Sequence, residues 1–325
     1  MGHFKPTQET KRIMTFPSSN DQLCKDLLDS SILDLEKISN HYKIEDLQSN
    51  FYKDIIIPIS LHFDSFPKRN EPYLICLTGG QGSGKTTMSY FIQEVLSKHC
   101  DRPSMGFSID DIYKSQEERK KISEEVHPLC YVRGVPGTHD VGMGMDLIKQ
   151  LSEANIDSVI KIPSFCKPED KHYPERDWPT YKGKPDFIFF DAWCGGAKPI
   201  SEENWLSPMN DLEREEDPEG IWSKWSNREL TKDYQDLFDR FDLLLMIKVP
   251  NMEFVYESRW IQEQTLAKTI KDPVLKEKIM TKEEVYRFVM HYERLTHYIL
   301  EEIPKLSDIV LERDEQFLFS ITKTP

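Results

Sequence analysis

The sequence predicts an α/β fold, with a mostly parallel sheet of five strands, helices on both faces of the sheet and a helical extension before it. Three observations carry this prediction. Short apolar runs of strand length alternate along the chain with longer segments of helical periodicity. The apolar runs are continuous, as is typical of parallel strands buried on both faces. A glycine-rich turn joins the first apolar run to an amphipathic helix, as in sheets that bind ligands at the carboxyl ends of their strands.

Length and composition indicate an ordinary globular protein with a substantial core. The chain has 325 residues, of which 38% are hydrophobic and 30% charged. We expect residues 1–20 to form a flexible tail, because they are polar and aperiodic. Residues 21–325 are expected to form one domain, with the helical extension at 21–68 and an insertion at 198–228.

Two helices are expected in the extension. A helical repeat of apolar residues predicts the first, and the segment 52–66 predicts the second, with an interruption at Pro58. The residues of the first repeat are Leu23, Leu27, Leu28, Ile32, Leu33 and Leu35. We interpret this extension as packing against the core.

The first strand, 73–78, leads into the glycine-rich turn. Residues 79–86 read GGQGSGKT and match the phosphate-binding pattern G-x-x-x-x-G-K-[ST]. In this pattern, glycines let backbone N–H groups face phosphate oxygens, the lysine reaches the β- and γ-phosphates, and the hydroxyl helps to hold Mg²⁺. The predicted nucleotide-binding residues are Gly79, Gly80, Gln81, Gly82, Ser83, Gly84, Lys85, Thr86 and Thr87. The fold is therefore predicted to be that of a P-loop NTPase, with ATP and Mg²⁺ as its ligands.

The helix after this loop presents one apolar face, made of Met88, Phe91, Ile92, Val95 and Leu96. Further strands are predicted at 105–109, 186–191 and 241–249, with a terminal strand or hairpin at 309–311 and 317–321. Further helices are predicted at 140–153, 252–271 and 282–302. Two long segments, 161–185 and 198–228, do not fit the alternation and are expected to be functional loops or insertions.

Charge and cysteine usage narrow the class of protein. The formal net charge of −14 disfavours partners such as nucleic acid and anionic lipid, which need basic surfaces. We therefore expect no nucleic-acid partner and no membrane partner, and no apolar run approaches the ~20 residues that span a bilayer. The six cysteines are scattered without a C-x-x-C pair, which indicates reduced thiols in a cytoplasmic or nuclear protein.

Acidic residues at the ends of two predicted strands are candidates for catalysis. Asp110 and Asp111 directly follow the second strand, where a carboxylate could accept a hydroxyl proton or order the Mg²⁺ shell. The alternative is a pair of helix-capping residues. Asp191 ends the third strand after four apolar residues, and burial of an unpaired acid there would be costly. Asp191 and Thr86 are the predicted ligands of the metal ion.

A compact polar turn, 133–140, combines a cation, two glycines, a proline, a hydroxyl, an imidazole and a carboxylate. Such a set could bind a polyhydroxy or carboxylate substrate. The alternative is a tight turn whose Thr138, His139 or Asp140 caps the next helix. The two interpretations are compatible.

Basic residues elsewhere are less specific. Arg259 lies four residues before Glu263, so that it either pairs with this acid or closes over the phosphates from a helix behind the fourth strand. The long loop carries Lys167, Lys171, Arg176 and Lys184. These could meet an anionic substrate, although lysines in loops are usually solvated.

Taken together, these motifs make the chain resemble the glycerate-kinase branch of the P-loop small-molecule kinases, relatives of uridine kinase, pantothenate kinase and phosphoribulokinase. Residues 108–113, S-I-D-D-I-Y, are similar to the S-x-D-D-F-Y motif of that group. Residues 133–140 are similar to its R-G-N-x-G-T-H-D motif. The chain departs from the group at Val135, at Ser258 and at Asp191-Ala-Trp193, where the group has Asn, Trp and Glu-Gly-Trp.

The resemblance implies roles for individual residues. Lys85, Asp110 and Arg259 take the catalytic positions, with Asp110 as the aspartate that orients or deprotonates the acceptor hydroxyl. The implied substrate-binding residues are Asp111, Tyr113, Arg133, Gly137, Thr138, His139 and Asp140. The hypothesis is an ATP-dependent kinase that phosphorylates a hydroxyl of a small polar metabolite, with glycerate as the leading acceptor. Alternatives are a nucleoside, pantothenate or a sugar phosphate as acceptor, or a regulatory ATP-binding protein.

Overall fold

A computed structural model of the chain describes residues 16–42, 44, 50–205, 208–269 and 279–325. Most of the predicted tail at 1–20, part of the extension and the end of the helix expected at 252–271 lie outside these residues. Within the described residues, no helix is long and apolar enough to cross a membrane.

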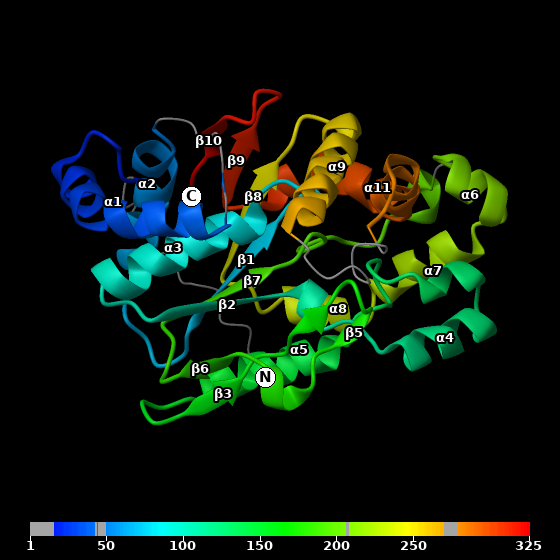
Figure 1. Cartoon of the computed structure of the whole chain (residues 1–325), viewed down its shortest axis with the longest axis horizontal. Coiled ribbons are helices and arrows are strands. Elements are labelled where there is room, and N and C mark those ends of the chain that lie inside the picture. The colour runs from blue at the N-terminus through cyan, green and yellow to red at the C-terminus, as the bar shows by residue number, and fades with distance from the viewer. Residues whose placement is uncertain (1–15, 43, 45–49, 206–207, 270–278) are drawn as a thin grey trace.

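The central feature is a sheet in the order β10-β9-β8-β1-β7-β2 (Figure 1). Its strands are β1 (Tyr73–Thr78), β2 (Ser104–Ser108), β7 (Phe187–Asp191), β8 (Leu243–Lys248), β9 (Ile309–Arg313) and β10 (Phe319–Lys323). The first five are parallel to one another, as predicted. The sixth, β10, pairs antiparallel with β9, so that the predicted terminal strand is a hairpin.

Helices cover both faces of this sheet, which confirms the predicted layers (Figure 1). They are α1 (Gln22–Tyr42), α2 (Ile57–Asp64), α3 (Lys85–His99), α4 (Gln116–Glu125), α5 (Val141–Ser152), α6 (Asp211–Glu216), α7 (Ile221–Glu229), α8 (Asp233–Phe238), α9 (Met252–Thr269) and α11 (Lys282–Leu306). The last helix runs one turn beyond the predicted end and contains Pro304.

Alternate residues of each strand enter two different cores. Ile75 and Leu77 face α1, α2 and α3, whereas Leu74 and Cys76 face α5, α8 and α11. Because successive side chains of a strand point to opposite faces, a strand covered on both sides is apolar throughout. The continuous apolar runs of the sequence have this origin.

The N-terminal extension packs against the first core, as expected. Leu27, Leu35 and Phe51 are buried against α3 and the sheet. The segment predicted as one helix with a break at Pro58 starts as a π-helical turn, Tyr52–Ile56, and continues as α2. Pro58 lies in the first turn of α2, where the lack of an N–H donor is tolerated.

The two segments that did not fit the predicted alternation of strands and helices contain more secondary structure than expected. The first, 161–185, forms two small hairpins, β3 (Val159–Lys161) with β6 (Thr180–Lys182) and β4 (Phe165–Cys166) with β5 (Lys171–His172). The second, 198–228, contains α6 and most of α7. These helices form because Leu212, Trp222 and Trp225 are buried in a small core with Val135, a contact over more than 70 residues that local periodicity does not reveal.

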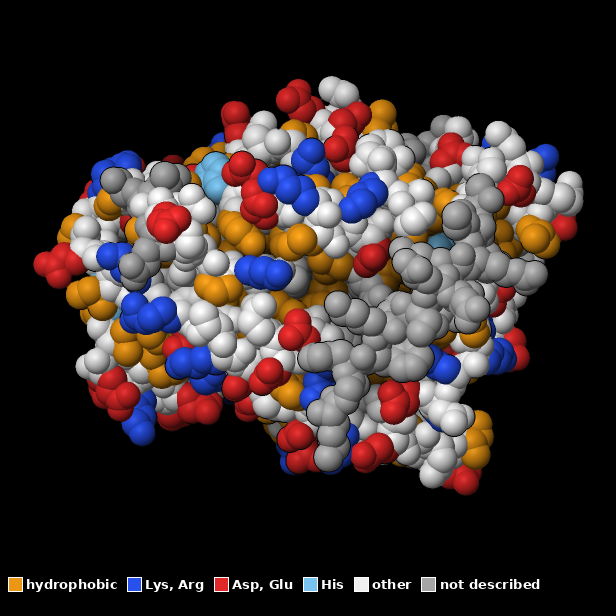
Figure 2. Space-filling model, turned by 180° about the vertical axis from the view of Figure 1, so that it is seen from behind, with side chains coloured by type: hydrophobic (Ala, Val, Ile, Leu, Met, Phe, Trp, Pro, Cys, Tyr) orange, Lys and Arg blue, Asp and Glu red, His pale blue; other side chains and the backbone are white. Residues whose placement is uncertain are grey.

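On the face of the molecule seen in Figure 2, the described acidic and basic side chains are interspersed rather than separated. The face seen in Figure 2 carries both signs, with hydrophobic side chains between them. The chain has 56 acidic and 42 basic residues. The described part of this face shows no broad basic stripe.

Candidate active site

The glycine-rich loop leaves β1 and turns sharply before α3. Gly79, Gly82 and Gly84 have φ angles of +138°, +73° and +99°, in the region where side chains are strained. A Cβ on Gly79 would lie 2.2 Å from the carbonyl oxygen of Ile247, and one on Gly82 would lie 2.5 Å from Cβ of Ser258. The loop is therefore held between β8 and α9 at distances that only glycine allows.

Lys85 begins α3, and its ammonium group is directed into the loop. Its Nζ donates to the carbonyl oxygens of Gly79 at 2.9 Å and Gly80 at 3.0 Å. Burial lowers the pKa of Lys85, whereas the carboxylates of Asp191 and Asp110 oppose this shift. The N-terminus of α3 and this ammonium group together form a positive cradle of the kind that binds phosphate.

Thr86 and Asp191 meet beside this cradle. The Thr86 hydroxyl donates to Oδ2 of Asp191, although the two residues are 105 apart in sequence. Burial raises the pKa of Asp191, opposed by Lys85 and by the bond from Thr86. A hydroxyl and a carboxylate are the hard oxygen ligands that Mg²⁺ prefers. The pair thus fits the magnesium ion that a nucleoside triphosphate carries.

Register brings the second acidic site to the same edge of the sheet. Ser108, the last residue of β2, pairs with Asp191 on β7, which in turn pairs with Leu77 on β1. The short 3₁₀ helix Ile109–Asp111 follows, with Ser108 as its N-cap. The carboxyl ends of β1, β2 and β7 thus place the loop, Asp191 and Asp110 side by side, and Asp110 contributes electrostatically to the pKa of Lys85.

Both carboxylate oxygens of Asp110 have donors. The Tyr113 hydroxyl donates to Oδ1, and Nζ of Lys167 lies 2.5 Å from Oδ2. Burial by itself would raise the pKa of Asp110, but the Lys167 ammonium and the hydrogen bonds outweigh it and hold the pKa well below its usual range. Asp110 is therefore an ionised acceptor at the edge of the sheet.

Asp111 has a different role in the structure. Its Oδ2 accepts a hydrogen bond of 3.0 Å from the backbone N–H of Ser108, which completes a capping box. Burial raises its pKa to about 6. Asp111 therefore takes part in capping this helix, although Ser108 and not Asp111 is the N-cap residue, and its contact with a substrate stays a prediction.

The turn 133–140 lies over α11 and β7. The Tyr292 hydroxyl donates to the carbonyl of Arg133 at 3.1 Å, and Nε1 of Trp193 donates to the carbonyl of Gly134 at 3.0 Å. Thr138 closes the turn from inside, since its hydroxyl donates to the carbonyl of Val135 at 2.8 Å and accepts from the N–H of Gly134 at 2.8 Å.

The other end of the turn rests on the insertion and on α8. A Cβ on Gly137 would lie 2.4 Å from the Trp225 ring, and the N–H of Gly137 donates to the Tyr234 hydroxyl at 2.9 Å. The ring of His139 contacts the same hydroxyl at 2.7 Å, and burial lowers its pKa to about 3. His139 is therefore neutral at physiological pH.

The structure confirms the capping alternative for Asp140, whose Oδ1 accepts from the N–H of Met143 at 2.9 Å. Thr138 and His139 have no exposed surface. Tyr113 stacks on the His139 ring at 4.9 Å and so joins this turn to Asp110. Contact of these residues with a substrate stays a prediction.

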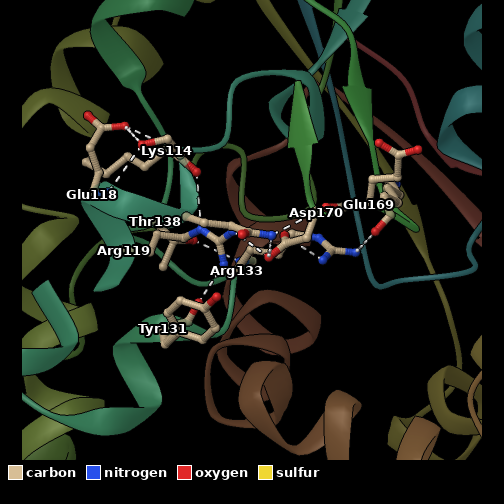
Figure 3. Close-up of polar contacts among 12 residues, drawn as sticks. Lys114, Glu118, Arg119, Tyr131, Arg133, Thr138, Glu169 and Asp170 are labelled. Atoms are coloured by element: carbon tan, nitrogen blue, oxygen red, sulfur yellow. Dashed lines mark hydrogen bonds and ion pairs between the residues drawn. The ribbon is translucent and has the colours of Figure 1, made fainter. Parts of the chain in front are cut away.

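The guanidinium of Arg133 is bound to an acid from another loop. Its Nη1 donates to Asp170 at 2.8 Å and its Nη2 to the carbonyl of Lys167 at 3.1 Å (Figure 3). The buried Arg119 binds the other carboxylate oxygen of Asp170 at 2.7 Å. Arg133 thus holds the hairpin turn beside the site.

Arg259 lies on α9, directly after Ser258, which packs against Gly82. It forms an ion pair with Glu263 at 2.9 Å, and the Glu263 side chain is only 3% exposed. The predicted i, i+4 pair therefore forms, with Glu263 buried and Arg259 partly buried. The small Ser258 is required where α9 crosses the loop.

Comparison with known proteins agrees with this architecture. No protein-family model matches the chain. It is 29% identical over 248 residues to a Schizosaccharomyces pombe protein named uncharacterized kinase mug58, covering 74% of this chain and 86% of the relative. The chain is thus similar over most of its length to a protein that is named as a kinase.

Two solved structures share the fold of this chain over most of its length. The structure titled YGR205w protein matches with a TM-score of 0.62 and 23% identity, over 91% of this chain and 97% of its own. A D-glycerate 3-kinase from Cryptococcus neoformans matches with a TM-score of 0.61 and 17% identity, over 92% and 98%. At this identity, the match establishes the fold.

Several residues at this candidate site were not selected from the sequence. Tyr292 and Trp225 support the turn, and Arg313 donates to the carbonyl of Gly82 at 2.8 Å from the end of β9. Their partners lie far away in the chain, so spacing gave no signal. Lys167 was one of four basic residues in its loop, and nothing local distinguished it.

Proposed function

We propose that the chain is an ATP-dependent kinase that transfers the γ-phosphoryl group to a hydroxyl of a small polar metabolite, with glycerate as the leading acceptor. The observation that carries this proposal is the meeting of three elements at one sheet edge: the phosphate loop, the Thr86–Asp191 pair and the ionised Asp110. Phosphoryl transfer requires that the triphosphate is bound, that a metal ion is held beside it and that the attacking hydroxyl is positioned. The loop, the Thr86–Asp191 pair and Asp110 correspond to these three requirements in that order.

In this proposal, the loop N–H groups and Lys85 hold the phosphates, and Thr86 and Asp191 hold Mg²⁺. When bound, this ion neutralises charge on the phosphate oxygens. Asp110 accepts the hydroxyl proton as the acceptor oxygen bonds to the γ-phosphorus and the bond to the β,γ-bridging oxygen breaks, which releases ADP. Asp110 then returns the proton to solvent.

The acceptor site is proposed to lie between Asp110 and the turn 133–140. The R-G-x-x-G-T-H-D resemblance supports glycerate, and the rigid anchoring of the turn by Trp193, Tyr292 and Trp225 suits a site that recognises a small polar molecule. A panel of hydroxy acids, nucleosides, pantothenate and sugar phosphates, followed by ADP release, separates glycerate from the alternative acceptors.

Two substitutions test the reaction itself. Lys85→Ala should abolish turnover and weaken ATP binding. Asp110→Asn should reduce kcat by about a hundredfold to ten-thousandfold, the range for loss of a general base, with nearly unchanged ATP affinity. Both are measured by ADP release and by calorimetric titration with ATP.

The control is Asp146→Asn, an exposed acid on α5, which should leave both quantities unchanged. An Asp110→Asn variant that keeps wild-type turnover, or that loses most of its ATP affinity, would contradict the assigned role. ATP binding without transfer to any acceptor would instead favour a regulatory ATP-binding protein.

A further inference from the structure

The turn between β4 and β5, residues 167–170, directs one lysine into the candidate active site. Nζ of Lys167 lies 2.5 Å from Oδ2 of Asp110, which is 57 residues away. Two other basic residues of the same loop pair locally at the surface, Lys171 with Glu169 at 2.7 Å and Arg176 with Asp177 at 3.7 Å. Lys167 differs from these two residues because its partner, Asp110, is a residue of the candidate active site.

Several contacts hold this turn in one conformation. Asp170 has a φ of +53°, and its backbone N–H donates to the carbonyl of Lys167 at 3.3 Å. The two oxygens of its carboxylate are held by Arg133 and by Arg119, which approach from different segments (Figure 3). Arg133 also donates to the carbonyl of Lys167 itself at 3.1 Å.

Arg119 makes this anchor rigid. Its side chain is 1% exposed. Besides Asp170 it donates to the carbonyls of Lys114 at 3.1 Å and Tyr131 at 2.5 Å. A buried guanidinium is tolerated only when its donors are bonded, so displacement of the turn would leave a buried charge without its partners. The backbone of Lys167 is therefore fixed beside the site.

The two donors on Asp110 differ in their freedom to move. Tyr113 is 3% exposed and stacked on His139, so that its hydroxyl is fixed. The side chain of Lys167 is 58% exposed and ends in a flexible four-carbon stem. An alcohol that approaches Asp110 must compete with one of these donors, and the lysine is the one that can leave.

Two neighbouring arginines are each bound to an acid, and both arginine side chains are partly buried. Arg133 is held by Asp170, and Arg259 is held by Glu263. An anionic oxygen that enters between Asp110 and the loop therefore reaches Lys167, whose side chain is 58% exposed, without first separating either arginine from its acid.

We propose that Lys167 is the anion-binding residue of this site: in the free protein it occupies Oδ2 of Asp110, and on substrate binding it moves to an anionic oxygen of the substrate. The move leaves Oδ2 to accept the hydroxyl proton, while the ammonium keeps its own protons. The anionic oxygen belongs either to a carboxylate or phosphate of the acceptor or to the γ-phosphoryl group of ATP. This inference rests on the proposed kinase function.

The test compares Lys167→Met, Lys167→Arg and, as the matched control, Lys171→Met at the first residue of β5. KM and kcat are measured with hydroxy compounds that do and do not carry an anionic group, and the affinities for ATP and ADP are measured by calorimetry. If the anion belongs to the acceptor, Lys167→Met raises the KM of anionic acceptors about tenfold to a hundredfold and leaves the ATP to ADP affinity ratio unchanged. If it is the γ-phosphoryl group, this ratio falls by a similar factor instead.

Lys167→Arg should retain most of either function, because it keeps the charge, and Lys171→Met should behave as the wild type. The inference is overturned if Lys167→Met matches Lys171→Met in both measurements while the wild type phosphorylates an acceptor; the proposed function then survives. If the wild type binds ATP but phosphorylates nothing, the proposed function fails. In that case only the ATP to ADP affinity ratio tests the inference. A ratio that is the same in Lys167→Met and in the wild type refutes it.

Discussion

Gly134→Ala tests whether the turn 133–140 is held as tightly as its contacts indicate. Gly134 has a φ of +127°, and a Cβ there would lie 1.7 Å from the hydroxyl oxygen and 2.3 Å from Cζ of Tyr292. Tyr292 is 2% exposed and packs against Trp193 at 5.0 Å, so that its ring has little room to withdraw. The substitution therefore combines backbone strain with a collision in the core.

The expected loss of stability is about 4 kcal/mol. Strain at this φ costs about 1–3 kcal/mol, overpacking of a core typically costs a further 1–3 kcal/mol, and the Tyr292–Arg133 hydrogen bond is worth about 1 kcal/mol. With an unfolding entropy of about 2.1 cal/mol/K per residue, the melting temperature of this chain should fall by roughly 6 °C. Differential scanning calorimetry measures it.

Gly183→Ala is the matched control. Gly183 also has a left-handed φ of +90°, but the nearest atom to its added Cβ is 3.8 Å away. It should therefore show the strain alone, about 1–3 kcal/mol and at the lower end where nothing else is crowded. If Gly134→Ala is no more destabilising than Gly183→Ala, Tyr292 does not confine the turn, and the reasoning about this site is refuted.

Two further predictions concern buried charge. His62 is buried among Phe16, Phe63 and Phe66, and burial lowers its pKa to about 4. Because the unfolded chain takes up the proton near pH 6.5, this stability contribution is complete above pH 6.5 and is lost as the pH falls towards 4. His62→Phe should reduce the loss between pH 7 and pH 5 by about 2 kcal/mol, measured by melting at both pH values; an unchanged loss would contradict the assignment. Glu213 pairs with Arg294 at 2.5 Å and is 2% exposed, so Glu213→Gln should destabilise by about 3–5 kcal/mol. The more exposed Glu216→Gln should cost about 1 kcal/mol or less in the same denaturation assay, and equal effects would show that burial does not matter.

The parts of the fold that the sequence predicted are those that depend on local patterns. Tyr73–Thr78 was predicted to the residue, because a continuous apolar run followed by a glycine loop has few other conformations. The capping alternative for Asp140 was likewise visible, since an N-cap bonds within its own first turn. The sequence did not reveal α6 and α7, whose burial depends on contact with the distant turn at Val135.

The candidate site also has parts that local sequence patterns predicted and parts that depend on contacts between distant residues. The phosphate loop, Asp191 and Asp110 were selected because each stands at the end of an apolar run, and parallel strands bring such ends together. Substrate binding by Arg133 stays a prediction, and the sequence did not reveal that its guanidinium holds Asp170, 37 residues away. Such a pairing depends on how two loops meet in space.

Sequence alone determined the phosphate loop and the acidic residues at the ends of two strands, because these follow from residues that are neighbours in the chain. Tertiary structure alone decided which side chains are committed to one another: Tyr292 under Gly134, Trp225 under Gly137, and Lys167 on Asp110. The reason is that burial and ion pairing depend on distances in space, and residues far apart in sequence come close only when the whole sheet and its covering helices are assembled.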